Sequence, residues 1–157
     1  MATYTITGGG NTGVSANAGD VKVLSVVVDF SSTTNSAGDV FECIELPANS
    51  WVAAAGIEVM TADTAGASGT VALGDGVDPD RYVSAVTVAN TNLVALRAFG
   101  GAASLGTTQV GTGNYIAADT IDVTVATGVI NAVIRVWAIV ANYDGLGDNE
   151  SQKVTFA

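Results

Sequence analysis

The sequence predicts an all-β protein, a single antiparallel β-sandwich of the jelly-roll type. Segments of alternating apolar and polar residues recur along the chain, separated by clusters of Gly, Asn, Asp, Ser and Thr. No long stretch has helical periodicity, and no internal repeat indicates a β-helix or a propeller. The 157 residues suit one domain that buries roughly two-thirds of the surface of its unfolded chain. Such a core needs no disulfide framework.

Residues 1–20 are expected to form an extended amino-terminal arm, and residues 21–157 the sandwich domain. Tyr4–Thr7 is predicted as a short first strand, and a glycine-rich, polar stretch follows it. The next strand has one clear core face. That face carries Leu24, Val26, Val28 and Phe30, with Lys22 at its exposed end. A loop is expected over residues 31–38.

Three further strands are predicted at residues 40–46, 57–61 and 70–73, each bounded by turn residues. The buried face of the first of them is ambiguous because its two alternating sets are both partly apolar. These sets are Val40, Glu42, Ile44 and Leu46 on one side, and Phe41, Cys43 and Glu45 on the other. Residues 89–99 fit either a strand or a short helix, and the pattern does not decide between them.

The last two predicted strands differ in how their faces alternate. In the first, Ile121, Val123 and Val125 alternate with Asp122 and Thr124, which predicts a half-buried strand with one wet face. In the second, residues 132–140, both faces are largely apolar. One face carries Val133, Arg135, Trp137 and Ile139, and the other carries Ile134, Val136, Ala138 and Val140. We predict a subunit contact there, in preference to a strand covered within one chain, because so little charge remains to cover a monomer.

The charge balance disfavours two classes of partner. Fifteen acidic and five basic residues give a net charge of −10, which repels phosphate backbones and anionic membranes.

The longest apolar run, residues 129–141, is shorter than the ~20 residues that span a bilayer. The first residues lack the basic and hydrophobic regions of a signal peptide. We therefore expect no nucleic-acid partner, no membrane partner and no secretion by that route.

Asp75, Asp78 and Asp80 place three carboxylates on one glycine-bearing loop. Calcium prefers such oxygen ligands, but the spacing differs from that of the twelve-residue helix-loop-helix site. Asp, Gly and Pro also provide the dihedral angles and side-chain hydrogen bonds of a tight turn. We predict a turn, and the sequence leaves open whether a cation binds to it.

No catalytic, cofactor-binding or metal site is predicted, so we do not expect an enzyme. The chain has no histidine and one cysteine, which excludes the usual triads and zinc ligand sets within one chain. Cys43 has no basic neighbour in the sequence and is predicted to be a small buried hydrophobe. Glu42, Glu45 and Glu58 could pair as in a glycosidase, but each is predicted to lie on a solvated strand face.

Several strand-and-turn motifs extend over most of the chain. They are the opening Met1-Ala2-Thr3-Tyr4 with its glycine-rich stretch, Val27-Val28-Asp29-Phe30-Ser31, Glu42-Cys43-Ile44-Glu45-Leu46-Pro47-Ala48, Gly56-Ile57-Glu58-Val59-Met60-Thr61-Ala62, Leu73-Gly74-Asp75-Gly76, Ala117-Ala118-Asp119-Thr120-Ile121-Asp122 and Ile134-Arg135-Val136-Trp137-Ala138. With these motifs the chain resembles small virion structural proteins of tailed bacteriophages, of the kind that decorate or cement the head.

This resemblance implies a jelly-roll subunit that is made in the host cytoplasm and assembles on the surface of the virion head. It would bind between capsomers and stabilise the shell, with the major capsid protein as its partner. A homotrimer would match a local three-fold position of the lattice. The arm over residues 1–20 would add a strand to an edge of the capsid protein or of a neighbouring subunit.

Two other functions stay open. One is a tail or fibre component, although the chain lacks the repeats and the coiled-coil segment of many fibres. The other is a carbohydrate-binding module in which Trp51 and Trp137 stack on sugars. An isolated tryptophan on a strand is, however, more often part of a core or of an interface.

Overall fold

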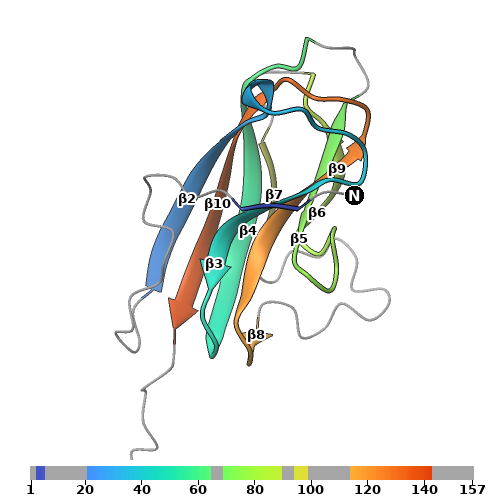
Figure 1. The fold of residues 1–157 in the computed structure, drawn as a ribbon. Helices are drawn as coiled ribbons and strands as arrows, with labels where there is room; N and C mark the ends of the chain where they lie inside the picture. The colour runs from blue at the N-terminus through green and yellow to red at the C-terminus, as the bar shows by residue number, and fades with distance from the viewer. Residues whose placement is uncertain (1–2, 6–20, 65–68, 90–93, 99–113, 143–157) are drawn as a thin grey trace, which may run out of the picture.

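The computed structural model describes residues 3–5, 21–64, 69–89, 94–98 and 114–142, which form two β-sheets packed face to face (Figure 1). The described elements are β1 (Thr3–Thr5), β2 (Val21–Asp29), the 3-10 helix η1 (Phe30–Ser32), β3 (Val40–Leu46), β4 (Ser50–Thr61), β5 (Thr70–Gly74), β6 (Val83–Thr87), β7 (Val94–Ala98), β8 (Asn114–Tyr115), β9 (Asp119–Thr127) and β10 (Val133–Asn142). One sheet has the order β1-β3-β9-β5-β6. The other has the order β2-β10-β4-β7, and β8 pairs with β4.

The strand order is that of a jelly roll. If the short β1 and β8 are set aside, the first, eighth, third and sixth of the remaining described strands form one sheet. The second, seventh, fourth and fifth form the other. Paired strands run antiparallel except for β1, which pairs in parallel with β3. The predicted fold class is therefore confirmed.

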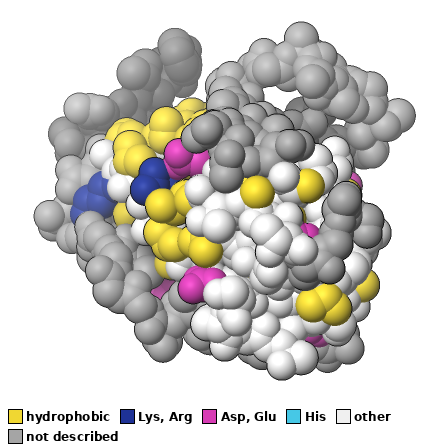
Figure 2. Space-filling model, turned by 90° about the horizontal axis from the view of Figure 1, so that it is seen from above, with side chains coloured by type: hydrophobic (Ala, Val, Ile, Leu, Met, Phe, Trp, Pro, Cys, Tyr) yellow, Lys and Arg dark blue, Asp and Glu magenta, His cyan; other side chains and the backbone are white. Residues whose placement is uncertain are grey.

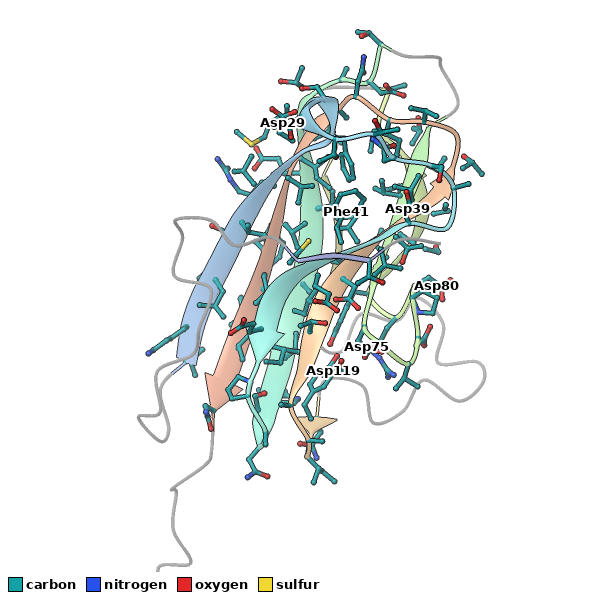
Figure 3. All side chains as sticks on the ribbon, in the orientation of Figure 1. Asp29, Asp39, Phe41, Asp75, Asp80 and Asp119 are labelled. Atoms are coloured by element: carbon teal, nitrogen blue, oxygen red, sulfur yellow. The ribbon has the colours of Figure 1, made fainter. Side chains whose placement is uncertain are left out.

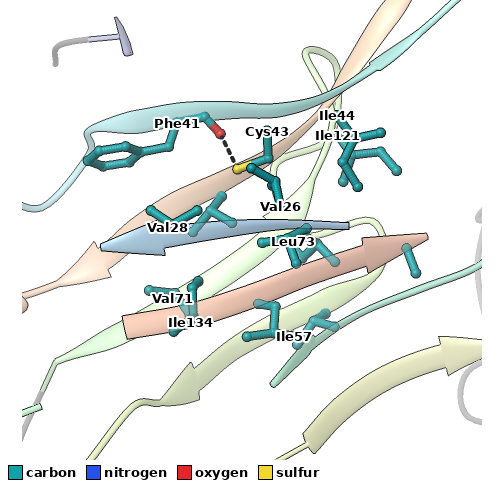
Figure 4. Close-up of a cluster of buried hydrophobic side chains, with 14 of the residues drawn as sticks. Val26, Val28, Phe41, Cys43, Ile44, Ile57, Val71, Leu73, Ile121 and Ile134 are labelled. Atoms are coloured by element: carbon teal, nitrogen blue, oxygen red, sulfur yellow. Dashed lines mark hydrogen bonds between the residues drawn. The ribbon is translucent and has the colours of Figure 1, made fainter. Parts of the chain in front are cut away.

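The core lies between the sheets and consists of the inward-facing residues of both. Phe30, directly after β2, packs the edge of its ring against Phe41 of β3, with ring centroids 4.9 Å apart. Figure 4 shows part of this cluster. The core faces that the sequence predicted are buried. They comprise Leu24, Val26 and Val28 on β2, and Ile121, Val123 and Val125 on β9. On β10, where both faces are apolar in the sequence, the structure buries Ile134, Val136, Ala138 and Val140.

A β-bulge in β3 decides which of its residues are buried. The pairing of β3 with β9 shifts register between Glu42 and Ile44. One extra residue in a strand reverses the alternation of its side chains beyond that point. Members of both alternating sets therefore turn inward, and the buried residues are Phe41, Cys43, Ile44 and Leu46.

Two elements extend the predictions. β4 begins at Ser50, before the strand predicted at residues 57–61. Its first half is rich in alanine, a poor strand former, and β10 fixes it by pairing along its length. Of the undecided residues 89–99, Val94–Ala98 form strand β7, which pairs with β4. Residues 90–93 and 99 lie outside the described part of the chain.

The prediction of a wet face for β9 is wrong at Asp122, whose residue surface is only 5% exposed. Asp122 is paired with Glu42 on β3 and with Gly74 on β5. The turn that follows Gly74 packs directly over Gly74, since a Cβ atom at Gly74 would collide with the backbone of Asp78 and Pro79. The turn thus covers the outer face of the sheet beside Asp122.

The first strand pairs with its own chain. Thr3, Tyr4 and Thr5 are in register with Val40, Phe41 and Glu42 of β3. The strand predicted at Tyr4–Thr7 therefore exists in part, at Thr3–Thr5. Residues 1–2 and 6–20 lie outside the described part, and the arm remains a prediction.

Candidate interaction surface

The outer surface of the β2-β10-β4 sheet is largely apolar. On β2, Leu24, Val26 and Val28 point inward, so the alternate valines point outward. The outward residues of β10 lie in register with them. We call this set the outer apolar face, and it consists of Val21, Val23, Val27, Val133, Trp137 and Ile139.

The exposure of this face is greatest along β2. Val21, Val23 and Val27 are 66%, 72% and 47% exposed, whereas the outward residues of β10 are half-buried. Figure 2 shows hydrophobic side chains gathered on the side of the molecule where β2 lies in Figure 1. Single exposed valines are ordinary, but a row of them on one strand indicates a contact surface.

One ion pair lies within the outer apolar face. Arg135 of β10 donates a hydrogen bond of 2.7 Å to Glu58 of β4, its partner in the register. The two side chains are 41% and 35% exposed. Because the two charges offset each other, the pair adds no net charge to the face.

β2 is also an edge strand of its sheet, and no described strand pairs with its outer edge. The strand is nine residues long and contains no proline. Lys22 lies near its beginning. Asp29 ends it and accepts hydrogen bonds from the backbone N–H and the hydroxyl of Ser31, at 2.9 and 2.6 Å. Long apolar edges of this kind pair readily with other strands.

Both tryptophans belong to this side of the sandwich. Trp137 is in register with Ser25 and Gly56, and Trp51 is in register with Ala141 at the other end of the sheet. Both side chains are half-buried. They therefore lie at the surface of the β2-β10-β4-β7 sheet rather than in the core. The register position of Ile139 lies between them.

Asp75 organises the turn between β5 and β6. Its Oδ1 atom accepts hydrogen bonds from the backbone N–H groups of Val77 and Asp78, at 3.0 and 2.8 Å. Its Oδ2 atom accepts the hydroxyl hydrogen of Tyr115 at 2.8 Å and forms an ion pair with Arg81. Figure 3 places Asp75, Asp80 and Asp119 on the β5 side of the sandwich, away from β2.

Electrostatics fix the protonation states in this turn. Burial opposes ionisation of Asp75, but the N–H groups, Tyr115 and Arg81 together hold the pKa of Asp75 below its usual value. Burial raises the pKa of Tyr82 and of Tyr115, whose hydroxyls are hydrogen-bonded to each other. Asp75 is therefore an ionised carboxylate surrounded by hydrogen-bond donors. Its bonds to the backbone N–H groups are the side-chain hydrogen bonds expected of the predicted turn.

The other candidate side chains are not brought together. Glu45 is exposed and Glu58 is paired with Arg135, while Glu42 lies opposite Asp122 on the other sheet. In the described part of the chain, no group of three or more Asp, Glu, Cys or His is placed to hold a metal ion. None of the helical segments described is long and apolar enough to cross a membrane.

Cys43 is a core residue, as predicted. It is 3% exposed, and its thiol donates a hydrogen bond of 3.1 Å to the carbonyl oxygen of Phe41. Burial raises the pKa of the thiol to about 12. A protonated, enclosed thiol is a poor nucleophile.

Sequence reasoning identified the core face of β2 and overlooked its outer face. The signal was present, since valines occur at positions 21, 23 and 27, all on the side opposite Leu24 and Val26. An outward valine is weak evidence alone, because exposed apolar residues are common. Only the strand order shows that this row lies along a sheet edge.

Comparisons with known proteins place the same fold in phage particles. No protein-family model matches the chain, and no curated protein matches it. A chain in the structure "Capsid of Ralstonia phage GP4" is 21% identical, with a TM-score of 0.57 over 83% of this chain and 90% of that chain. A chain in "Cyanophage Pam1 capsid asymmetric unit" is 24% identical, with a TM-score of 0.55 over 80% of this chain and 86% of that chain. At these identities the likeness establishes the fold.

Proposed function

We propose that this chain is a structural protein of a phage capsid, and specifically a decoration or cement protein of the head. The observation that carries the proposal is the extent of the two capsid matches, which cover at least 80% of this chain and 86% of the other chains. The likeness therefore extends over nearly all of each chain in those capsid structures. Fold alone does not assign function, so the surface must support it as well.

The surface favours binding to protein. The outer apolar face is suited to a desolvated contact, and its one ion pair is internally balanced. The described residues bring together no group of three or more Asp, Glu, Cys or His that could hold a metal ion. A cement protein needs contacts and no chemistry.

Stabilisation follows from differential binding. A protein that binds the assembled, expanded shell more tightly than its free subunits shifts the equilibrium toward the shell. The major capsid protein is the proposed partner, and the chain would join the head surface after synthesis in the host cytoplasm. A homotrimer at local three-fold positions would present the same patch to each equivalent capsid subunit. The arm over residues 1–20, apart from Thr3–Thr5, which pair with β3 of the same chain, would add a strand to an edge of a neighbouring protein.

Copy number per virion tests this proposal first. Quantitative mass spectrometry of purified particles would compare this chain with the major capsid protein. A number comparable to that of the capsid protein is expected for a decoration protein. A handful of copies would instead indicate a tail or fibre component, and absence from the particle would overturn the proposal.

Binding to heads tests the mechanism. Purified chain is expected to bind expanded heads that lack it, to raise their resistance to heat, and to bind unexpanded heads more weakly. Removal of residues 1–20 is expected to weaken this binding. Glycan arrays provide the comparison for the carbohydrate alternative, in which Trp51→Ala and Trp137→Ala would remove a signal from the wild-type chain.

A further inference from the structure

We propose that the outer edge of β2 is a self-association site, where β2 of a second copy of this chain pairs antiparallel across a two-fold axis at Ser25. The β2-β10-β4-β7 sheets of the two copies would then form one continuous sheet. This inference does not rest on the proposed function, since two copies can pair whether or not the chain binds a phage head.

The edge meets the requirements for strand addition. All nine residues of β2 pair with β10 on one side, from Val21 with Ala141 to Asp29 with Val133. On the other side no described strand contributes hydrogen bonds. Edges of this length usually carry charged residues, proline or a bulge that prevents pairing. The middle of β2, from Val23 to Val28, has none of these.

The sequence of β2 fits a copy of itself. With the axis at Ser25, Val23 of one copy lies opposite Val27 of the other, and Val21 lies opposite Asp29. This register uses all nine residues, and it keeps the outward faces of both copies on one side of the sheet. Directly opposed β-branched residues stabilise strand pairs. Valines that are 72% and 47% exposed in one copy would thus cover each other in two.

Charge favours a second copy at this edge over other parts of the surface. Two chains of net charge −10 repel, so the contact must avoid carboxylates. Asp75, Asp80 and Asp119 lie on the β5 side, away from β2. Within β2 one cation, Lys22, lies near the beginning and one anion, Asp29, at the end. In this register Lys22 lies opposite Val28 and Asp29 lies opposite Val21, so no two like charges are directly opposed.

A single cysteine tests the register. In the proposed pair the two Ser25 Cα atoms lie about 4.5–5.5 Å apart, which is within the range that a disulfide bridges, about 4.4–6.8 Å. Ser25→Cys in the full chain, exposed to oxidised glutathione, is expected to form a covalent dimer rapidly. Ser84→Cys is the matched control, because Ser84 is also exposed and lies on β6, the edge strand of the other sheet. Equal dimer formation by the two variants would overturn the proposal.

Paired charges give a second, non-covalent test. Val23→Lys with Val27→Lys places lysine opposite lysine in both copies, whereas Val23→Lys with Val27→Glu places lysine opposite glutamate. Both double variants remove the same two valines. The Lys/Lys variant is expected to dimerise on the order of tenfold more weakly than the Lys/Glu variant in sedimentation velocity. Equal affinities, or a wild-type chain that stays monomeric at all concentrations, would refute the pairing.

The test also separates this contact from one with the capsid protein. If the edge of β2 instead joins the shell, the free chain is monomeric and Ser25→Cys cross-links only to capsid protein on heads. That result would overturn the self-association while leaving the decoration function in place.

Discussion

Asp122 of β9 lies directly opposite Glu42 of β3, on the covered outer face of the β1-β3-β9-β5-β6 sheet. No described residue provides a hydrogen bond to the Oδ1 atom of Asp122. Burial, together with the charges of Asp119, Glu42 and Asp75, raises the pKa of Asp122 to about 6 from an ordinary 3.8. The folded state therefore binds a proton here more tightly than the unfolded state does.

This pair predicts a pH dependence of stability. Asp122 adds stability below pH 3.8, and that contribution is lost as pH rises through about 6. Asp122→Asn keeps the shape and removes the charge, so it is expected to stabilise the fold at pH 7.5 by roughly 1–3 kcal/mol. Denaturant unfolding at several pH values measures this. The gain should shrink toward pH 4, and a gain that is constant with pH would contradict the assignment.

Asn35 joins two loops at one end of the sandwich. Its amide nitrogen donates to the carbonyl oxygen of Ile130 at 2.8 Å, and its Oδ1 atom accepts the N–H of Ile130 at 2.9 Å. Asn35→Ala leaves both buried backbone groups without these partners and is expected to cost roughly 2–4 kcal/mol. Thr33→Ala, an exposed neighbour, is the control and should change the free energy of unfolding by less than about 0.5 kcal/mol. Equal losses in the two variants would show that the hydrogen bonds between Asn35 and Ile130 contribute nothing to stability.

The Tyr115 hydroxyl supports the turn around Asp75. Tyr115→Phe removes the hydrogen bond to Asp75 and the one shared with Tyr82, and it is expected to destabilise the fold by about 1–3 kcal/mol. Urea unfolding measures this loss.

Calcium distinguishes the turn from a cation site. Since donors surround the Asp75 carboxylate, millimolar calcium is expected to leave the midpoint of thermal unfolding unchanged. A rise in that midpoint which Asp75→Asn abolishes would instead establish cation binding at the turn.

Cys43 is expected to be inert in the folded protein. Because its thiol is buried and protonated, thiol reagents at pH 8 should label it only after unfolding. Mass spectrometry of native and urea-treated samples measures the labelling. Fast labelling of the native chain would show that β3 opens readily. An inert Cys43 also lets a single cysteine introduced at Ser25 be read without interference.

Sequence patterns predicted most of the sandwich, because strands with one covered face alternate visibly. The runs at residues 24–30 and 121–125 lie in the structure with the predicted residues inward. For residues 132–140, the pattern predicted a strand but did not decide which face is inward. Patterns failed where a neighbour overrode the local signal. The first half of β4 is held by β10 despite its alanines, and Asp122 is covered by the turn after Gly74.

The candidate surface divides in the same way. The two apolar faces of residues 132–140 are legible in the sequence, and so is the scarcity of charge. The neighbours of that strand are not, because a sheet joins residues that are far apart along the chain. The valines of β2 form an edge only because β10 and β4 lie on one side of β2 and no described strand on the other.

The sequence by itself determined the class of fold, the inward residues of β2 and β9 and the lack of a histidine-based active site, since these depend on residue type and local period. The tertiary structure decided the strand order, the bulge at Glu42–Ile44, the burial of Asp122 and the edge at β2. Each of these depends on which strands pair, and pairing is set by packing between distant segments rather than by the sequence of either one.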